Sequence, residues 1–235
     1  MKNWKSMEEV FALLNKKCRY LILRNYEGFF DDILIEGHND IDVLCASKQD
    51  RKNMVNILQA TTRIGIDNGI HYKFMYRDKE VALDIRTVGD GYYDEKWQKN
   101  MIKNRIYNDL GFYTMNTSDY FYSLIYHAIY QKKEFSEEYS TRLQSMDIKT
   151  KGYSEQQFEE MLYDFMTKND YYYTKTYDKY VLLYFNQEIV RDRFKYPYKI
   201  KIKHLCEKIE EYILGKLNGA RVRCIKYIKN YKDRE

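Results

Sequence analysis

Apolar and polar residues along the first half of the chain form short blocks that predict helices and strands. The segment 7–17, MEEVFALLNKK, carries Val10, Leu13 and Leu14 on one face at helical spacing, which indicates an amphipathic helix. Short apolar runs predict four strands, at 19–23, 40–45, 71–76 and 81–86. Two further segments are helical in pattern, 47–58 with a serine cap at its start and 95–105. The polar residues 77–80 are of hairpin length, so they connect the last two strands.

From Thr117 onward the pattern changes to one of helices with few strand signals. Apolar residues recur there at helical spacing: Phe121, Leu124, Ile125, Ala128 and Ile129. Further helices are predicted at 158–166, 181–194 and 204–217. We therefore place a boundary near residue 115, with an N-terminal part, 1–114, and a mainly helical part, 115–235, that pack against each other.

The composition indicates a folded protein, and the apolar runs bear on its location in the cell. The 235 residues are 44% hydrophobic, enough for a substantial core. No stretch approaches the roughly 20 apolar residues of a membrane helix, and the first residues lack the apolar run of a secretory signal. We expect a cytoplasmic protein without a membrane span.

The net charge of +5 is concentrated in the last twenty residues, 216–235. This tail interleaves basic residues with Val222, Ile225 and Ile228, a pattern compatible with contact to RNA or another anionic surface. Packing of a final amphipathic helix explains the same pattern. A nucleic-acid partner is possible but not favoured.

Three aspartates are the candidate chemical centre. Side chains alternate along a strand, so Asp40 and Asp42 point the same way while Ile41 and Val43 point into the core. Two ionised carboxylates so close together are unfavourable unless a cation lies between them, and oxygen ligands of this kind suit Mg²⁺, with Mn²⁺ as an alternative. Asp84 is the one acid inside the apolar run 81–85. A neighbouring strand would bring it beside the first pair.

Such a triad, with two metal ions about 3.5–4 Å apart, would orient a triphosphate and help an acceptor hydroxyl attack it. Asp84 is then a general base or a ligand of the second metal. The structural alternative is that Asp40 and Asp42 only cap and solubilise a strand edge. In that case Asp84 pairs with an arginine such as Arg86.

The order of these elements resembles the DNA polymerase beta-type nucleotidyltransferases. The resemblance rests on GHNDIDVL followed by VALDIR, and it covers residues 8–90. It implies an α+β fold, with a small mixed β-sheet flanked by helices and then a helical domain that holds the acceptor. It also implies that Asp40 and Asp42 are the metal-binding pair and Asp84 the third carboxylate. YLILRNYE, GDGYYDEKW and FYSLIYHAIYQKK resemble segments of bacterial members, some linked to surface-polysaccharide synthesis.

The sequence departs from the family where the first strand ends. Members usually carry Gly-Ser or Gly-Gly there, whereas this chain has Leu23-Arg24-Asn25. The Arg24 guanidinium could meet a phosphate instead. The candidate substrate-binding residues are Arg24, Asn25, His38, Arg86, His127 and Lys132. Three of these residues have a purely structural alternative. His38 would be a loop histidine without a ligand, His127 a histidine satisfied in a helical core, and Lys132 a lysine in solvent.

The function predicted from these residues is a Mg²⁺-dependent nucleotidyltransferase. It would move a nucleotidyl group from a nucleoside triphosphate to a small polar acceptor such as a sugar, an alditol phosphate or an antibiotic. One alternative is a catalytically degenerate binding module of the same fold. Another is a phosphocholine or sugar-phosphate transferase that uses a nucleotide-activated donor.

Overall fold

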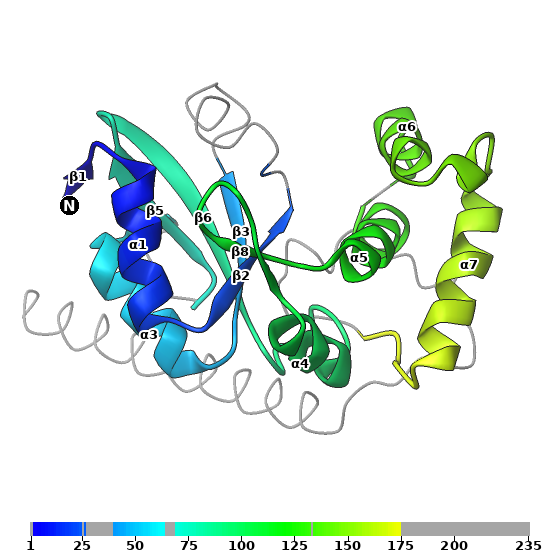
Figure 1. The fold of residues 1–235 in the computed structure, drawn as a ribbon, viewed down its shortest axis with the longest axis horizontal. Coiled ribbons are helices and arrows are strands. Elements are labelled where there is room, and N and C mark those ends of the chain that lie inside the picture. The colour runs from blue at the N-terminus through cyan, green and yellow to red at the C-terminus, as the bar shows by residue number, and fades with distance from the viewer. Residues whose placement is uncertain (1, 25, 27–39, 64–68, 133, 175–235) are drawn as a thin grey trace, which may run out of the picture. The chain divides into compact units, whose positions relative to one another are not determined.

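The computed structural model describes residues 2–24, 26, 40–63, 69–132 and 134–174, all within one compact unit, Met1–Lys195. The described chain contains an eight-stranded sheet and six α-helices (Figure 1). The strands are β1 (Asn3–Trp4), β2 (Tyr20–Arg24), β3 (Asp40–Cys45), β4 (Thr61–Thr62), β5 (His71–Tyr76), β6 (Lys79–Thr87), β7 (Ile106–Tyr107) and β8 (Tyr113–Thr114). The helices are α1 (Met7–Lys17), α3 (Lys48–Leu58), α4 (Glu95–Lys103), α5 (Thr117–Tyr130), α6 (Glu137–Met146) and α7 (Glu155–Lys168).

The sheet is mixed, with the strand order β1-β5-β6-β3-β2-β8-β7 and β4 beside β5. Its centre is β3, which runs parallel to β6 and antiparallel to β2. The hairpin of β5 and β6 turns at Arg77 and Asp78, both with positive φ. This arrangement confirms the mixed sheet with flanking helices that the sequence predicts.

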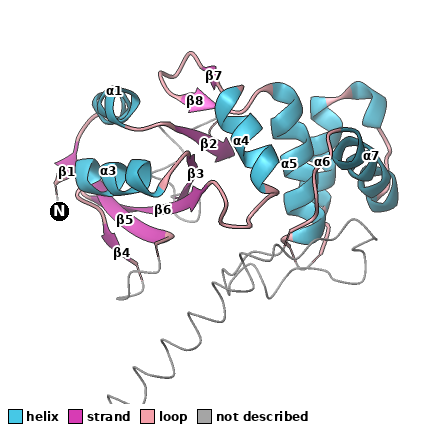
Figure 2. Cartoon of the chain, turned by 90° about the horizontal axis from the view of Figure 1, so that it is seen from below, coloured by secondary structure: helices cyan, strands magenta, loops and turns pink. Residues whose placement is uncertain are grey.

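Helices α1 and α3 pack against each other on one face of the sheet (Figure 2). The Ser6 side chain caps α1 by accepting a hydrogen bond from the N–H of Glu9, and Ser47 caps α3 in the same way. Buried side chains of α1, including Val10 and Leu14, join alternate residues of the strands in one apolar cluster. This face is closed by hydrophobic packing.

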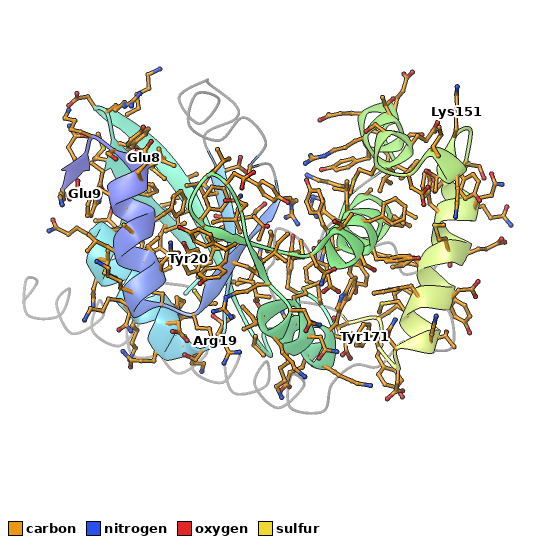
Figure 3. All side chains as sticks on the ribbon, viewed as in Figure 1. Glu8, Glu9, Arg19, Tyr20, Lys151 and Tyr171 are labelled. Atoms are coloured by element: carbon orange, nitrogen blue, oxygen red, sulfur yellow. The ribbon has the colours of Figure 1, made fainter. Side chains whose placement is uncertain are left out.

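Helices α4, α5 and α7 enclose a second cluster on the other side. Leu21 of β2 and Leu44 of β3 point into it, together with residues of α5 and α7 such as Leu124. Tyr171, labelled in Figure 3, stacks on Trp97 of α4 with ring centroids 5.5 Å apart. The predicted boundary near residue 115 stays a prediction, and this cluster contains residues from both sides of it.

Most of the predicted elements are confirmed within the described residues. The four predicted strands correspond to β2, β3, β5 and β6, and the helix predicted at 47–58 is α3 with its serine cap. Helix α6 and the two-residue strands were not predicted. The helices predicted at 181–194 and 204–217, and the basic tail, lie outside the described residues.

Candidate functional site

The three predicted aspartates come from the two central strands. In the parallel pairing of β3 with β6, Asp42 is the register partner of Asp84 and Asp40 is the partner of Ala82. Register partners on neighbouring strands face the same side of the sheet, and alternation puts Asp40 on that side as well. We call Asp40, Asp42 and Asp84 the acidic triad. The acidic triad lies on the same face of the sheet as Leu44, which packs in the apolar cluster that contains residues of α4 and α5.

An irregularity in β2 brings a cation to this face. Ile22 pairs with Val43, but Arg24 rather than Leu23 pairs with Asp42, so one extra residue is inserted into β2. Such a bulge re-aims the side chains that follow it. As a result, Nη2 of Arg24 lies 3.0 Å from Oδ2 of Asp42.

Two tyrosines hold the Arg24 guanidinium in place. Nη2 donates to the phenol oxygen of Tyr92 at 2.6 Å, and Nη1 donates to that of Tyr93 at 3.4 Å. Burial by itself lowers the pKa of Arg24, but the charge of Asp42 and the two phenols outweigh it and hold the pKa well above its usual value. Arg24 is therefore a permanently charged, buried group beside Asp42.

Asp84 is held by two basic side chains. Its Oδ1 lies 2.9 Å from Nδ1 of His71 and 3.2 Å from Nη1 of Arg63. Burial raises the pKa of Asp84, but the hydrogen bond from His71 and the charges of His71, Arg86 and Arg63 outweigh it and leave the pKa below its usual value. Asp84 is therefore ionised near neutral pH and is a weak base.

Among the described residues, no cation forms a comparable ion pair with Asp40. Its pKa is raised, first by burial of the carboxylate and then by the negative charge of Asp42, while Asp84 adds to the effect and Arg24 opposes it. The ionised triad is thus electrostatically unfavourable at Asp40 in the absence of a further cation.

The chemistry of the triad fits Mg²⁺, which prefers carboxylate oxygens. The ion pairs use Oδ2 of Asp42 and Oδ1 of Asp84, which leaves the second oxygen of each carboxylate outside these pairs. Metal-binding carboxylates are commonly oriented by hydrogen bonds of this kind. As the side chains lie, no three acidic, histidine or cysteine groups among the described residues meet closely enough to hold an ion. The metal site stays a prediction.

Three predicted substrate-binding residues gather around Tyr92, although they lie far apart in sequence. The guanidinium of Arg24 donates to the Tyr92 phenol, and Cζ of Arg86 lies 4.1 Å from the centroid of its ring. Nδ1 of His127, from α5, lies 3.4 Å from the same phenol oxygen. These contacts join β2, β6 and α5 in one polar cluster beside the triad.

The remaining predicted residues are placed as follows. Lys132 is exposed just after α5, with Nζ 6.0 Å from the ring centroid of Tyr139. Asn25 and His38 lie outside the described residues. The bland interpretation of Lys132 as a solvated lysine agrees with its exposure, and its charge still acts on His127.

Several partners of the site were not predicted from the sequence. Tyr92 and Tyr93 were not among the predicted site residues, yet both are fully buried against Arg24. The contact of His71 with Asp84 could have been predicted from the sequence. A two-residue turn at 77–78 pairs Tyr76 with Lys79, and the same register pairs His71 with Asp84. For the tyrosines we find no comparable local signal.

Comparisons with protein families, with curated proteins and with solved structures found no match to this chain. In the part of the chain that the structure describes, every helix is too short or too polar to cross a membrane.

Proposed function

We propose that this protein is a Mg²⁺-dependent nucleotidyltransferase that acts in the cytoplasm. It moves a nucleotidyl group from a nucleoside triphosphate to a small polar acceptor such as a sugar, an alditol phosphate or an antibiotic. The observation that carries the proposal is the register of β3 and β6, which puts Asp42 opposite Asp84 with Asp40 on the same face. In this proposal 1–114 is the catalytic domain and 115–235 the acceptor-binding domain.

Each residue of the site has a distinct part in the proposal. Asp40, Asp42 and Asp84 supply oxygen ligands, and Mg²⁺, when bound, neutralises charge on the triphosphate and on the pyrophosphate that leaves. Arg63 and His71 hold Asp84 through one oxygen, which orients the other. Arg24 occupies the position at which the resembled family has backbone amides, so its guanidinium is the group that meets a phosphate.

The burial of Arg24 supports this assignment. A guanidinium fixed by two phenols and a carboxylate is preorganised, so no side-chain freedom is lost when a phosphate oxygen approaches. Arg86 adds a second cation to the same cluster through its contact with the Tyr92 ring. Together these groups make the face of the triad attractive to an anionic substrate.

The test is pyrophosphate release by the purified full-length protein with Mg²⁺, each labelled nucleoside triphosphate and a pool of polyols and sugar phosphates. Asp42→Ala is the active-site variant, and Asp109→Ala, at an exposed aspartate outside the site, is its matched control. We expect release by the wild type and by Asp109→Ala, and loss of release in Asp42→Ala. No release by the wild type with any donor would overturn the proposal.

One observation favours a second candidate, a catalytically degenerate binding module. Arg24 already neutralises the charge of Asp42, so this carboxylate does not need a metal ion for that purpose. Such a module would bind a nucleotide without Mg²⁺ and release no pyrophosphate. A nucleotide affinity unchanged by removal of Mg²⁺, together with no turnover, identifies this candidate. A transferase that uses a nucleotide-activated donor would instead release a nucleoside monophosphate or diphosphate from that donor.

A further inference from the structure

One edge of the sheet exposes two large apolar side chains. They belong to β7, where Ile106 is 47% and Tyr107 is 61% exposed. β7 is the last of the described strands in the order of the sheet, with β2 and β8 between it and β3, so this edge lies apart from the acidic triad. Apolar side chains exposed on an edge strand are a common mark of a binding surface.

The hairpin of β7 and β8 is attached to the C-terminal half of α1 (Figure 2). Nδ2 of Asn15 donates to the carbonyl oxygen of Gly111 at 2.8 Å, and the Tyr20 phenol donates to Oδ1 of Asn15 at 2.8 Å. The ring of Tyr113 in β8 lies against that of Tyr20, with centroids 6.4 Å apart. The exposed strand β7 therefore lies beside the segment 15–20.

The two apolar side chains of β7 face opposite sides of the sheet. Thr114 is the register partner of both Ile106 and Ile22, and Ile22 belongs to the apolar cluster beneath α1. Register partners face the same side, so Ile106 is on the side that carries α1. Alternation puts Tyr107 on the other side, where its ring packs against Tyr113 with centroids 5.3 Å apart. The edge thus presents an apolar side chain on each side.

Cations lie near both of these side chains. Lys16 and Lys17 are exposed in the last turn of α1, and the exposed Arg19 follows them. Across the sheet, Cζ of Arg105 lies 4.5 Å from the centroid of the Tyr113 ring. We use the name basic edge for the set Lys16, Lys17, Arg19, Arg105, Ile106 and Tyr107.

The basic edge has an excess of positive charge. Among the described residues, the acids beside it are Asp50 at the start of α3 and the exposed Asp109 in the turn of the hairpin. The Asp50 carboxylate already accepts hydrogen bonds from the N–H of Arg19 at 2.8 Å and from the Ser47 hydroxyl at 2.5 Å. Four cations outnumber these two carboxylates, so the charge favours an anionic partner.

Charge and apolar exposure together select the kind of partner. A second copy of this chain would bring the same cations against each other, which costs free energy. A nucleic acid offers phosphates to the cations and bases to Tyr107, but no comparable contact to the aliphatic side chain of Ile106. An anionic bilayer offers charged headgroups to lysine and arginine and an apolar boundary to Ile106, and tyrosine is favoured at that depth.

We propose that the basic edge binds the surface of an anionic lipid bilayer. Ile106 and Tyr107 enter the boundary between headgroups and acyl chains, while the lysines and arginines lay their apolar stems along it and keep their charges at the headgroups. The inference goes beyond the proposed function and does not depend on it, because β2 and β8 separate β7 from the strands of the triad.

The test is sedimentation of the full-length protein with vesicles of phosphatidylcholine, either alone or with about a third phosphatidylserine. We expect binding to the anionic vesicles that weakens as the salt concentration rises, because salt screens the attraction. The combined variant Lys16→Gln, Lys17→Gln and Arg19→Gln should lower the affinity for these vesicles at least about tenfold. Absence of wild-type binding to the anionic vesicles would overturn the inference.

A matched control removes the same charge at another surface. It combines Lys149→Gln, Lys151→Gln and Lys168→Gln, all at exposed positions. Lys151 lies at the opposite end of the described structure from Arg19 (Figure 3). We expect this control to bind anionic vesicles like the wild type. Equal losses in the two triple variants would overturn the inference, because net charge alone would then explain the binding.

The apolar part of the basic edge needs a separate measurement. Ile106→Ser should lower the affinity for anionic vesicles about fivefold. Tyr107→Trp adds a fluorophore at the edge, and its emission can be followed because Trp4 and Trp97 are only 2% and 0% exposed. We expect the emission of this variant to shift to shorter wavelength on anionic vesicles and to stay unchanged with single-stranded RNA. A shift with RNA but not with vesicles would overturn the inference and assign the edge to nucleic acid.

Discussion

Nη2 of Arg24 lies 3.0 Å from Oδ2 of Asp42, and the two side chains are only 8% and 12% exposed. A bulge in β2 makes this contact, because regular pairing would put Leu23 opposite Asp42. The positive charge of Arg24 thus lies beside Asp42, one of the three carboxylates of the acidic triad. Stability and metal binding are expected to depend on the same carboxylate, and the following predictions separate the two.

Removing the arginine should destabilise the protein. Arg24→Met leaves Asp42 buried and uncompensated, which typically costs about 3–5 kcal/mol of the free energy of unfolding. Urea unfolding without divalent ions measures this loss. Arg19→Met, at an exposed arginine of the same region, is the matched control and should stay within about 0.5 kcal/mol of wild type. Equal losses in the two variants would show that the ion pair contributes nothing specific.

The same variant should bind Mg²⁺ more tightly, because Arg24 repels a cation that approaches Asp42. Thermal unfolding of Arg24→Met with and without Mg²⁺ measures this, since a ligand that binds only the folded state raises its stability. We expect a larger Mg²⁺-induced rise in Tm than in the wild type. An equal or smaller rise would indicate that Asp42 takes no part in metal binding.

Asp40 should limit stability when no metal is present. Its folded-state pKa is raised, so the folded protein binds this proton more readily than the unfolded chain does, and stability falls as pH rises above the unfolded value of about 3.9. Asp40→Asn is therefore expected to raise Tm at pH 7 in EDTA, with a gain that disappears below about pH 3.9. The same variant should lose the Mg²⁺-induced rise. A lower Tm at pH 7 would contradict this account of Asp40.

Asp84 should have the opposite pH dependence. Its folded-state pKa is lowered, so it contributes stability that is present above the unfolded value of about 3.9 and lost as pH falls through the folded value. Asp84→Asn should be less stable than wild type at pH 7, and the difference should shrink in acid. Urea unfolding at a series of pH values measures it, with the exposed Asp109→Asn as control. A difference that does not change with pH would rule out stabilisation of the ionised Asp84 carboxylate by His71 and Arg63.

The sequence predicts the fold well where one side of an element is apolar. Strands β3 and β6 were predictable because isolated acids interrupt otherwise apolar runs, and alternation then puts Asp40 and Asp42 on one face. Helix α6 was missed because Leu143 is its one fully buried side chain, so it has no apolar stripe to detect. A local pattern of apolar residues indicates which face of a helix or strand is buried, and α6 has almost no buried face.

The partners of the triad were harder to predict because they depend on tertiary contacts. The bulge at Leu23 is fixed by pairing with β3, and nothing in the run YLILR distinguishes it from a regular strand. The meeting of Arg24, Arg86 and His127 around Tyr92 depends on how α5 packs against the sheet. Candidate residues could be chosen by chemical type, but their contacts required the structure.

Whether the acidic triad binds metal can be measured by calorimetric titration of Mg²⁺ into wild type, Asp42→Asn and Asp109→Asn, each in the presence of the same nucleoside triphosphate. Both variants remove one negative charge, but only Asp42 belongs to the acidic triad. We expect Asp109→Asn to bind Mg²⁺ like the wild type and Asp42→Asn to bind it at least about tenfold more weakly, a loss of about 1.4 kcal/mol. Equal Mg²⁺ affinity in all three proteins would contradict the claim that the triad is a metal site.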